Sequence, residues 1–174
     1  MSTLERAIAI AAQAHEGQKD KAGTPYVLHP LRMMLSLKTT DERITAVLHD
    51  VVEDCEGWSF ERLQEEGFSE EIIEALKSVT KREGEPYEDF VRRAATNAIG
   101  IRVKLADLTD NCDVSRIANP TARDHERIAK IHFYKTSTGA GAIGVGIRGA
   151  LARQWEGLKE RILGSARISG VIGH

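Results

Sequence analysis

Helical periodicity runs through almost the whole chain and restricts its fold more than any other feature. Apolar residues recur three and four positions apart in successive segments, which is the spacing of one face of an α-helix. The sequence lacks stretches that combine strict alternation with β-branched side chains, the pattern of a half-buried strand. Short connections with glycine, proline and capping residues separate the helical segments. The sequence therefore predicts an all-α fold with essentially no sheet.

Size and composition are those of a single globular domain. The chain has 174 residues, of which 41% are hydrophobic and 29% are charged. Its net charge of −2 provides no basic excess for binding nucleic acid through phosphates. No apolar run reaches the roughly 18 residues of a membrane span, and the N-terminus lacks a signal-peptide pattern. Cys55 and Cys112 form neither a disulfide framework nor a zinc-ribbon spacing, which is typical of a reducing compartment. From charge, hydropathy and cysteine usage together, we expect a cytoplasmic protein without nucleic-acid or membrane partners.

Glycine divides the chain near its C-terminal end. Five glycines fall within residues 139–149, and each costs about 1 kcal/mol relative to alanine inside a helix. We therefore expect residues 1–135 to form the folded domain and residues 136–149 to be a flexible connection. Residues 150–174 begin with an amphipathic pattern, from which we expect a helix followed by a frayed tail. The amphipathic helix could pack on the domain, recruit a partner or join two copies as a homo-oligomer.

The segment Asp41–Asp54 carries the densest group of reactive side chains. Taken as one continuous helix, it places its apolar residues on one side and four polar residues on the other: His49, Asp50, Glu53 and Asp54. Such a face is either a solvated acidic surface, as on many helices, or a set of metal ligands and bases.

Two residues elsewhere add to this group. His29 stands directly before Pro30, which we expect to begin a helix, so its imidazole is either a helix cap or a ligand in a fixed position. Asp107 lies among apolar residues, and a buried carboxylate is costly unless it is paired or bound to a cation. Lys104, one turn earlier, could be that partner, and Asn111 follows one turn later on the same face.

Two imidazoles and two carboxylates come from these positions: His29, His49, Asp50 and Asp107. This donor mixture suits a divalent transition ion such as Mn²⁺, Fe²⁺ or Zn²⁺ with open positions for water or substrate. Such an ion can lower the pKa of a bound water and neutralise phosphoryl oxygens. Glu53 and Asp54 would then orient or deprotonate the attacking water.

The order of these residues resembles the H…HD…D pattern of the HD-domain metal-dependent phosphohydrolases. The surrounding motifs, in order over residues 4–130, resemble the hydrolase domain of RelA/SpoT homologues and their small stand-alone relatives: His15-Glu-Gly-Gln-Lys-Asp-Lys-Ala-Gly-Thr-Pro-Tyr26, Leu28-His-Pro30, Leu48-His-Asp-Val-Val-Glu-Asp54, Val79-Thr-Lys81, and Val103-Lys-Leu-Ala-Asp107 with Asn111. Those enzymes use Mn²⁺ to remove pyrophosphate from the ribose 3′ position of guanosine tetraphosphate (ppGpp) and pentaphosphate. The resemblance implies a compact HD-domain helical bundle, a divalent metal cofactor and a nucleotide substrate.

The resemblance also implies roles for individual residues. The implied metal ligands are His29, His49, Asp50 and Asp107. The implied water-activating pair is Glu53 and Asp54. The implied substrate-binding residues are Lys21, Asn111 and Arg127.

Two stretches depart from the family pattern, and both fall on the substrate side. Asp20 stands where the family has an arginine before its lysine, and Cys112-Asp113-Val114 replaces Met-Arg-Thr. An arginine grips phosphate, whereas an aspartate repels it. The alternative to a hydrolase is therefore a nucleotide-binding regulatory module with little or no turnover.

Overall fold

The computed structural model describes residues 2–20, 22–111, 113 and 121. Within them, eight helices follow one another: α1 (Leu4–Ala14), α2 (Leu28–Ser36), α3 (Thr40–Leu48), α4 (Val51–Asp54), α5 (Phe60–Glu65), α6 (Glu70–Val79), α7 (Tyr87–Ala94) and α8 (Ala98–Asn111). The extended pairing found in this part of the chain is a single isolated bridge between Lys19 and Pro25. The predicted all-α class is confirmed.

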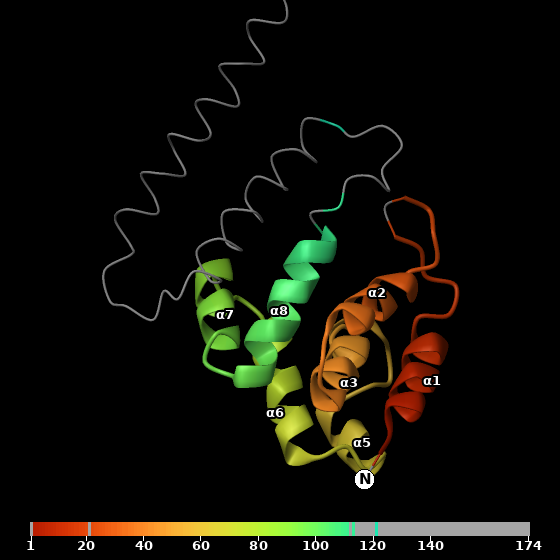
Figure 1. The fold of residues 1–174 in the computed structure, drawn as a ribbon, viewed down its shortest axis with the longest axis horizontal. Coiled ribbons are helices and arrows are strands. Elements are labelled where there is room, and N and C mark those ends of the chain that lie inside the picture. The colour runs from red at the N-terminus through yellow and green to blue at the C-terminus, as the bar shows by residue number, and fades with distance from the viewer. Residues whose placement is uncertain (1, 21, 112, 114–120, 122–174) are drawn as a thin grey trace, which may run out of the picture.

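Helix α3 forms the centre of the bundle. It contacts α1, α2, α6 and α8, and it lies between α1 on one side and α8 on the other (Figure 1). Residues 44–48 of α3 are all buried, as expected for a helix enclosed on several sides. The helix begins at a capping box, in which the Thr39 hydroxyl accepts from the Glu42 amide and the Glu42 carboxylate accepts from the Thr39 amide.

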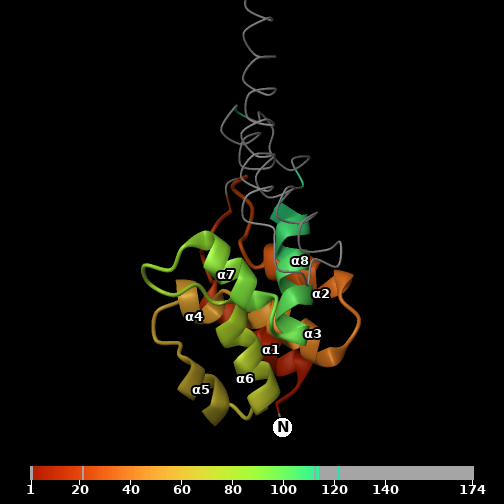
Figure 2. The ribbon, with the colours of Figure 1, turned by 90° about the vertical axis from the view of Figure 1, so that its left-hand side faces the viewer.

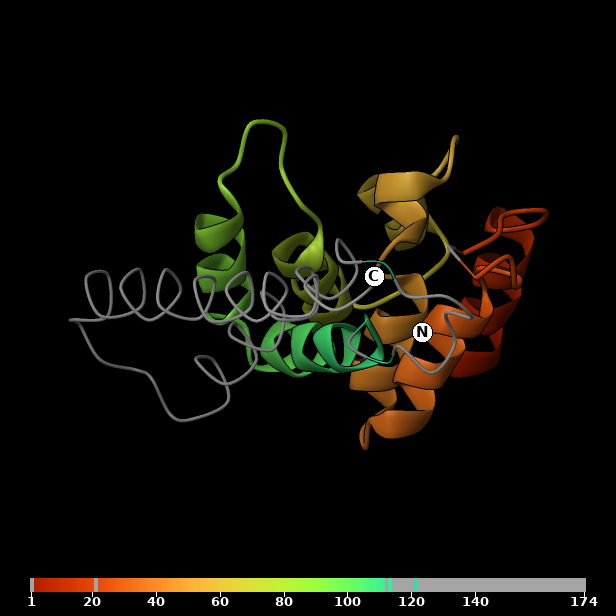
Figure 3. The same cartoon turned by 90° about the horizontal axis from the view of Figure 1, so that it is seen from above.

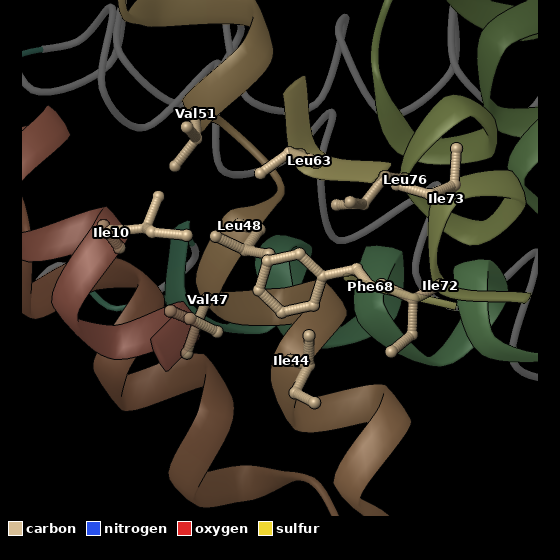
Figure 4. Packing of buried hydrophobic residues seen from close by; sticks show 12 residues of the cluster. Ile10, Ile44, Val47, Leu48, Val51, Leu63, Phe68, Ile72, Ile73 and Leu76 are labelled. Carbon is tan, nitrogen blue, oxygen red and sulfur yellow. The ribbon is translucent and has the colours of Figure 1, made fainter. Parts of the chain in front are cut away.

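The hydrophobic core has a main cluster and a second cluster. The main cluster joins α1, α3, α5 and α6, and Figure 4 shows the Phe68 ring beside Leu48 and Ile44 within it. The second cluster connects α2 and α3 with α6, α7 and α8 through six buried residues: Met33, Leu37, Ala46, Val79, Ala94 and Val103. Each large apolar side chain buried in this way contributes about 1.5–3 kcal/mol. The second cluster therefore fixes α2 and α8 relative to α3.

Helix α7 lies against α6 and α8 (Figure 2), at the opposite end of the bundle from α1 (Figure 3). The approach of α8 to α6 is close at Gly100. A Cβ atom added to Gly100 would lie 2.1 Å from Ser78 Oγ and 3.2 Å from the Ala94 carbonyl oxygen. Because real Cβ atoms do not approach other atoms so closely, the packing of these two helices requires glycine at this position.

The predicted continuous helix over residues 41–54 is wrong. Helix α3 ends at Leu48, and α4 begins at Val51 after a turn at His49 and Asp50. At this break the His49 ring Nδ1 donates to the Ala46 carbonyl at 2.9 Å. That carbonyl is the acceptor that the Asp50 amide would use in a continuing helix.

Helix α2 begins two residues earlier than expected. It starts at Leu28, so His29 and Pro30 are its second and third residues rather than its entrance. Proline is tolerated there because the first amides of a helix have no intrahelical acceptor. His29 therefore lies in the first turn of α2.

Several predictions concern residues outside the described part of the chain. They are the domain boundary at residue 135, the connection over residues 136–149, the amphipathic helix within residues 150–174 and the homo-oligomer through that helix. Among the helices that the structure describes, none combines the length and the apolar character needed to cross a membrane.

Candidate metal centre

Two histidines and an aspartate meet where α2 passes the turn between α3 and α4. His29 comes from the first turn of α2, and His49 and Asp50 form the turn itself. One ligand atom from each residue lies within 4.8 Å of the other two. His49 Nε2 is 2.9 Å and His29 Nε2 is 4.0 Å from the same atom, Asp50 Oδ2. The structure thus brings together three of the four predicted metal ligands.

The spacing and chemistry of this group fit a divalent ion. Metal–ligand bonds of about 2.1 Å place adjacent ligand atoms roughly 3–4 Å apart. Each ring has its Nδ1 engaged by an acceptor, the Ala46 carbonyl for His49 and the Asp110 carboxylate for His29. Because an acceptor requires a proton on Nδ1, Nε2 is the nitrogen that each ring presents to the group. Two imidazoles and a carboxylate suit a transition ion with open positions.

The group is strongly charged when no ion is bound. Burial disfavours a charged His49 ring, but the charge of Asp50, its hydrogen bond with the ring and the charge of Asp107 together outweigh burial and raise the pKa of His49 to about 9. Burial also disfavours ionised Asp50, yet the charge of His49 and hydrogen bonds from His49 and Tyr26 lower its pKa to about 2. A metal ion and a proton therefore compete for His49 Nε2 at neutral pH.

Asp107 lies beside this group rather than within it. Its Oδ1 is 3.6 Å from His29 Nε2 and accepts a hydrogen bond from Asn111, while Lys104 Nζ donates to its Oδ2 at 2.7 Å. Lys104 is thus the salt-bridge partner that the sequence offered as an alternative. Burial disfavours ionised Asp107, but the charge of Lys104, the charge of His49 and the hydrogen bond from Lys104 hold its pKa well below the ordinary value.

Tyr26 holds the Asp50 carboxylate in place. Its hydroxyl donates to Asp50 Oδ2, the same oxygen that faces both histidines. Burial and the negative charge of Asp50 raise the pKa of Tyr26 well above its ordinary value, so the hydroxyl keeps its proton. Sequence reasoning gave Tyr26 no role, although it ends the first of the matching motifs and stands three residues before His29.

The two predicted water-activating residues differ in their surroundings. Both belong to the short helix α4 and are exposed. Glu53 Oε2 accepts a hydrogen bond from the Lys81 amide at 3.0 Å, which links α4 to the end of α6. Partial burial, together with the charges of Asp50 and Glu53, raises the pKa of Asp54. A raised pKa is what a general base near neutral pH requires.

Of the three predicted substrate-binding residues, the structure describes only Asn111. Its side-chain amide donates to Asp107 Oδ1, so it contacts a predicted metal ligand. Lys21 and Arg127 lie outside the described residues. Their predicted contacts with a nucleotide stay predictions.

Asp20, the residue that departs from the family pattern, closes its own loop. Its carboxylate accepts hydrogen bonds from the Ala22 amide at 2.9 Å, the Thr24 amide at 3.0 Å and the Thr24 hydroxyl at 2.8 Å. These bonds are those of an aspartate that caps a tight turn. The structure thus shows a structural use for the residue that stands in place of an arginine.

Sequence reasoning also missed Asp110 and Arg32. Asp110 Oδ2 lies 2.7 Å from His29 Nδ1, and Arg32 donates to both oxygens of the same carboxylate. The signal that could have identified Asp110 is its position three residues after Asp107, because residues three apart share a helix face.

A family model described as an HD domain matches residues 7–99. The chain belongs to the HD domain family. The matched stretch of this HD domain contains His29, His49 and Asp50 and ends before Asp107.

Several curated relatives resemble this HD domain over part of their own length. It is 32% identical over 120 residues to a guanosine-3′,5′-bis(diphosphate) 3′-pyrophosphohydrolase of Aquifex aeolicus. The aligned stretch covers 62% of this chain and 17% of that protein. It is 35% identical over 136 residues to the enzyme of the same name from Haemophilus influenzae, with 70% and 20% covered. A probable GTP pyrophosphokinase of Mycobacterium leprae is 32% identical over 133 residues, with 69% and 17% covered. The HD domain thus spans a fifth or less of these relatives.

A solved structure matches nearly the whole chain. It is that of a metazoan ortholog of SpoT, a protein described as hydrolysing ppGpp and playing a role in starvation responses. The TM-score is 0.63 at 23% sequence identity, with 99% of this chain and 98% of the other covered. At this identity the likeness concerns the fold, and it confirms the predicted HD-domain helical bundle.

Proposed function

We propose that this HD domain is a metal-dependent phosphohydrolase that releases pyrophosphate from the ribose 3′ position of ppGpp or a closely related nucleotide. The observation that carries the proposal is the meeting of His29, His49 and Asp50 around one point. Similarity to named ppGpp 3′-pyrophosphohydrolases supports the choice of substrate. We assign the activity to residues 1–135.

In this proposal the three converging residues hold the ion, and Asp107 is the fourth ligand. Mn²⁺ is the expected ion because mixed imidazole and carboxylate ligands suit it and the resembling enzymes use it. A divalent ion bound there lowers the pKa of a water and neutralises phosphoryl oxygens. Asp107 Oδ1 already lies 3.6 Å from His29 Nε2. To join the other three ligands, the Asp107 carboxylate would need only a small rotation away from Lys104.

The chain's own residues move the proton. Asp54, whose pKa is raised, accepts the proton of the water that attacks the phosphorus next to the ribose 3′ oxygen. Glu53, tied to the Lys81 amide, orients that water. The bond between this phosphorus and the 3′ oxygen breaks, pyrophosphate leaves, and the proton passes to the 3′ oxygen. We assign the nucleotide contacts to Lys21, Asn111 and Arg127.

The test is an assay of pyrophosphate release from ppGpp in the presence of Mn²⁺. We expect turnover by the wild-type chain and a loss of more than a hundredfold in His49→Ala, with metal content lost in parallel. Glu66→Ala, which changes a carboxylate remote from the group, controls for unspecific effects of substitution. Failure to release phosphate or pyrophosphate from guanosine polyphosphates, NADPH and common nucleotides would contradict the enzymatic function.

A nucleotide-binding regulatory module is the second candidate. It is favoured by the engagement of Asp107 with Lys104 and Asn111, which leaves this carboxylate outside the converging group. Tight binding of ppGpp in the presence of Mn²⁺, without any product, would support this candidate over the hydrolase.

A further inference from the structure

Helix α8 presents one carboxylate to each ring nitrogen of His29. Asp107 Oδ1 is 3.6 Å from Nε2, and Asp110 Oδ2 is 2.7 Å from Nδ1. The two aspartates are three residues apart on α8, so they lie on the same face about one turn apart. The 2.7 Å distance at Nδ1 is that of a hydrogen bond, whereas the 3.6 Å distance at Nε2 is too long for one. Nε2 therefore remains available to the group formed with His49 and Asp50.

Arg32 fixes the orientation of the Asp110 carboxylate. Its Nε donates to Asp110 Oδ1 at 2.7 Å and its Nη2 donates to Oδ2 at 3.0 Å, which is a two-pronged arginine–carboxylate pair. The Asp110 side chain is only 10% exposed. Because Arg32 follows His29 by three residues on α2, the guanidinium and the imidazole approach the carboxylate from the same helix.

We propose that Asp110 and Arg32 are positioning residues that hold the His29 ring with Nδ1 protonated and Nε2 directed at the metal. The inference rests on the metal centre of the proposed function. A carboxylate can only accept from Nδ1, so it selects the tautomer whose Nε2 carries the lone pair. The negative charge of Asp110 also makes the ring a stronger ligand, and loss of such a partner commonly weakens metal binding about 10–100-fold.

The chain contains a matched pair that serves as a control. Arg6 donates through Nε and Nη2 to the two oxygens of Glu66, each at 2.8 Å, which reproduces the geometry of Arg32 and Asp110. This pair joins α1 to the residue that follows α5. Removing Glu66 therefore removes an equivalent ion pair without touching the metal group.

The first measurement is the dissociation constant for Mn²⁺, determined by calorimetry on the full chain. We expect Asp110→Ala to weaken binding about 10–100-fold. We expect Asp110→Asn, which keeps an acceptor, to lie between Asp110→Ala and the wild type, and Glu66→Ala to stay within twofold of it. Affinity within twofold of the wild type for Asp110→Ala would overturn the inference. A wild-type chain that binds no divalent ion would instead overturn the metal centre itself, and the inference with it.

The second measurement is the hydrogen exchange of the His29 Nδ1 proton, followed by ¹H–¹⁵N NMR of the Zn²⁺-loaded chain. A role limited to stability would leave this proton unaffected in folded variants. We expect slow exchange in the wild type and in Glu66→Ala, and fast exchange or a lost signal in Asp110→Ala. If Asp110→Ala does not fold, Asp110→Asn and Arg32→Gln replace it: affinity reduced at least threefold with faster exchange supports the inference, and wild-type values for both overturn it.

Discussion

His49 and Asp50 are consecutive residues, yet His49 Nε2 lies 2.9 Å from Asp50 Oδ2. In a regular helix, neighbouring side chains point about 100° apart. At the turn between α3 and α4 both residues keep right-handed helical backbone angles, and each still brings one ligand atom within 4.8 Å of the imidazole of His29. Two adjacent residues therefore supply two of the three members of the candidate metal centre.

We expect Tyr26→Phe to weaken metal binding severalfold and to slow turnover about tenfold. The substitution keeps the ring but removes the hydroxyl that donates to Asp50 Oδ2, so the ligand oxygen loses its fixed position. A hydrogen bond to a charged group contributes about 1.5–3 kcal/mol, so stability should also fall measurably. Mn²⁺ titration and urea unfolding check both effects. Wild-type affinity in a correctly folded Tyr26→Phe would show that Asp50 needs no such support.

Lys104→Met tests whether Asp107 binds the ion. Lys104 is the buried cation that neutralises Asp107 in the absence of metal, and removing one partner of a buried ion pair costs about 3–5 kcal/mol. We expect that loss in urea unfolding of the metal-free protein and a substantially smaller loss with saturating Mn²⁺, because the ion supplies the missing charge. Equal destabilisation in both conditions would contradict the assignment of Asp107 as a ligand.

The ion pair of Glu85 and Arg93 should make stability fall at acidic pH. Hydrogen bonds from Arg93 lower the pKa of Glu85 from 4.5 to about 2. A carboxyl group whose pKa is depressed by folding stabilises the native state above its unfolded pKa. This contribution is therefore complete above about pH 4.5 and disappears as the pH falls toward 2.

Urea unfolding of Glu85→Gln checks this dependence. We expect the variant to be less stable than the wild type at pH 7, with the difference shrinking steadily between pH 4.5 and pH 2. A difference that does not change over this range would show that the native pKa of Glu85 is not depressed.

Gly100→Ala should destabilise the protein by about 1–3 kcal/mol, the usual cost of overpacking. The added Cβ would meet Ser78 Oγ at 2.1 Å, so either Ser78 gives up its hydrogen bond to the Ala75 carbonyl or α6 and α8 separate. Ser78→Ala removes that oxygen, and we expect the double variant to recover much of the loss in thermal unfolding. If Gly100→Ala is as stable as the wild type, the two helices do not pack as closely as described.

Local sequence patterns were sufficient for much of the fold. Thr39, Ser59 and Pro86 immediately precede α3, α5 and α7, and such helix starts can be recognised in the sequence because capping and apolar periodicity depend on residues within one or two turns. The same patterns did not reveal the break between α3 and α4, because the apolar periodicity of residues 41–54 continues across it.

The three residues that converge, His29, His49 and Asp50, could be predicted as candidate ligands from the sequence, because they are histidines and an aspartate within the matching motifs. Their supports could not. His29 and Asp110 are 81 positions apart, and Tyr26 and Asp50 are 24 apart. Residue identity and local spacing therefore determined most of the helices and the candidate ligands. The packing of α2 and α8 against α3 decided which nitrogen of His29 faces His49 and Asp50 and which carboxylate contacts the other nitrogen. Sequence patterns cannot show this, because contacts between distant segments exist only once the core has formed.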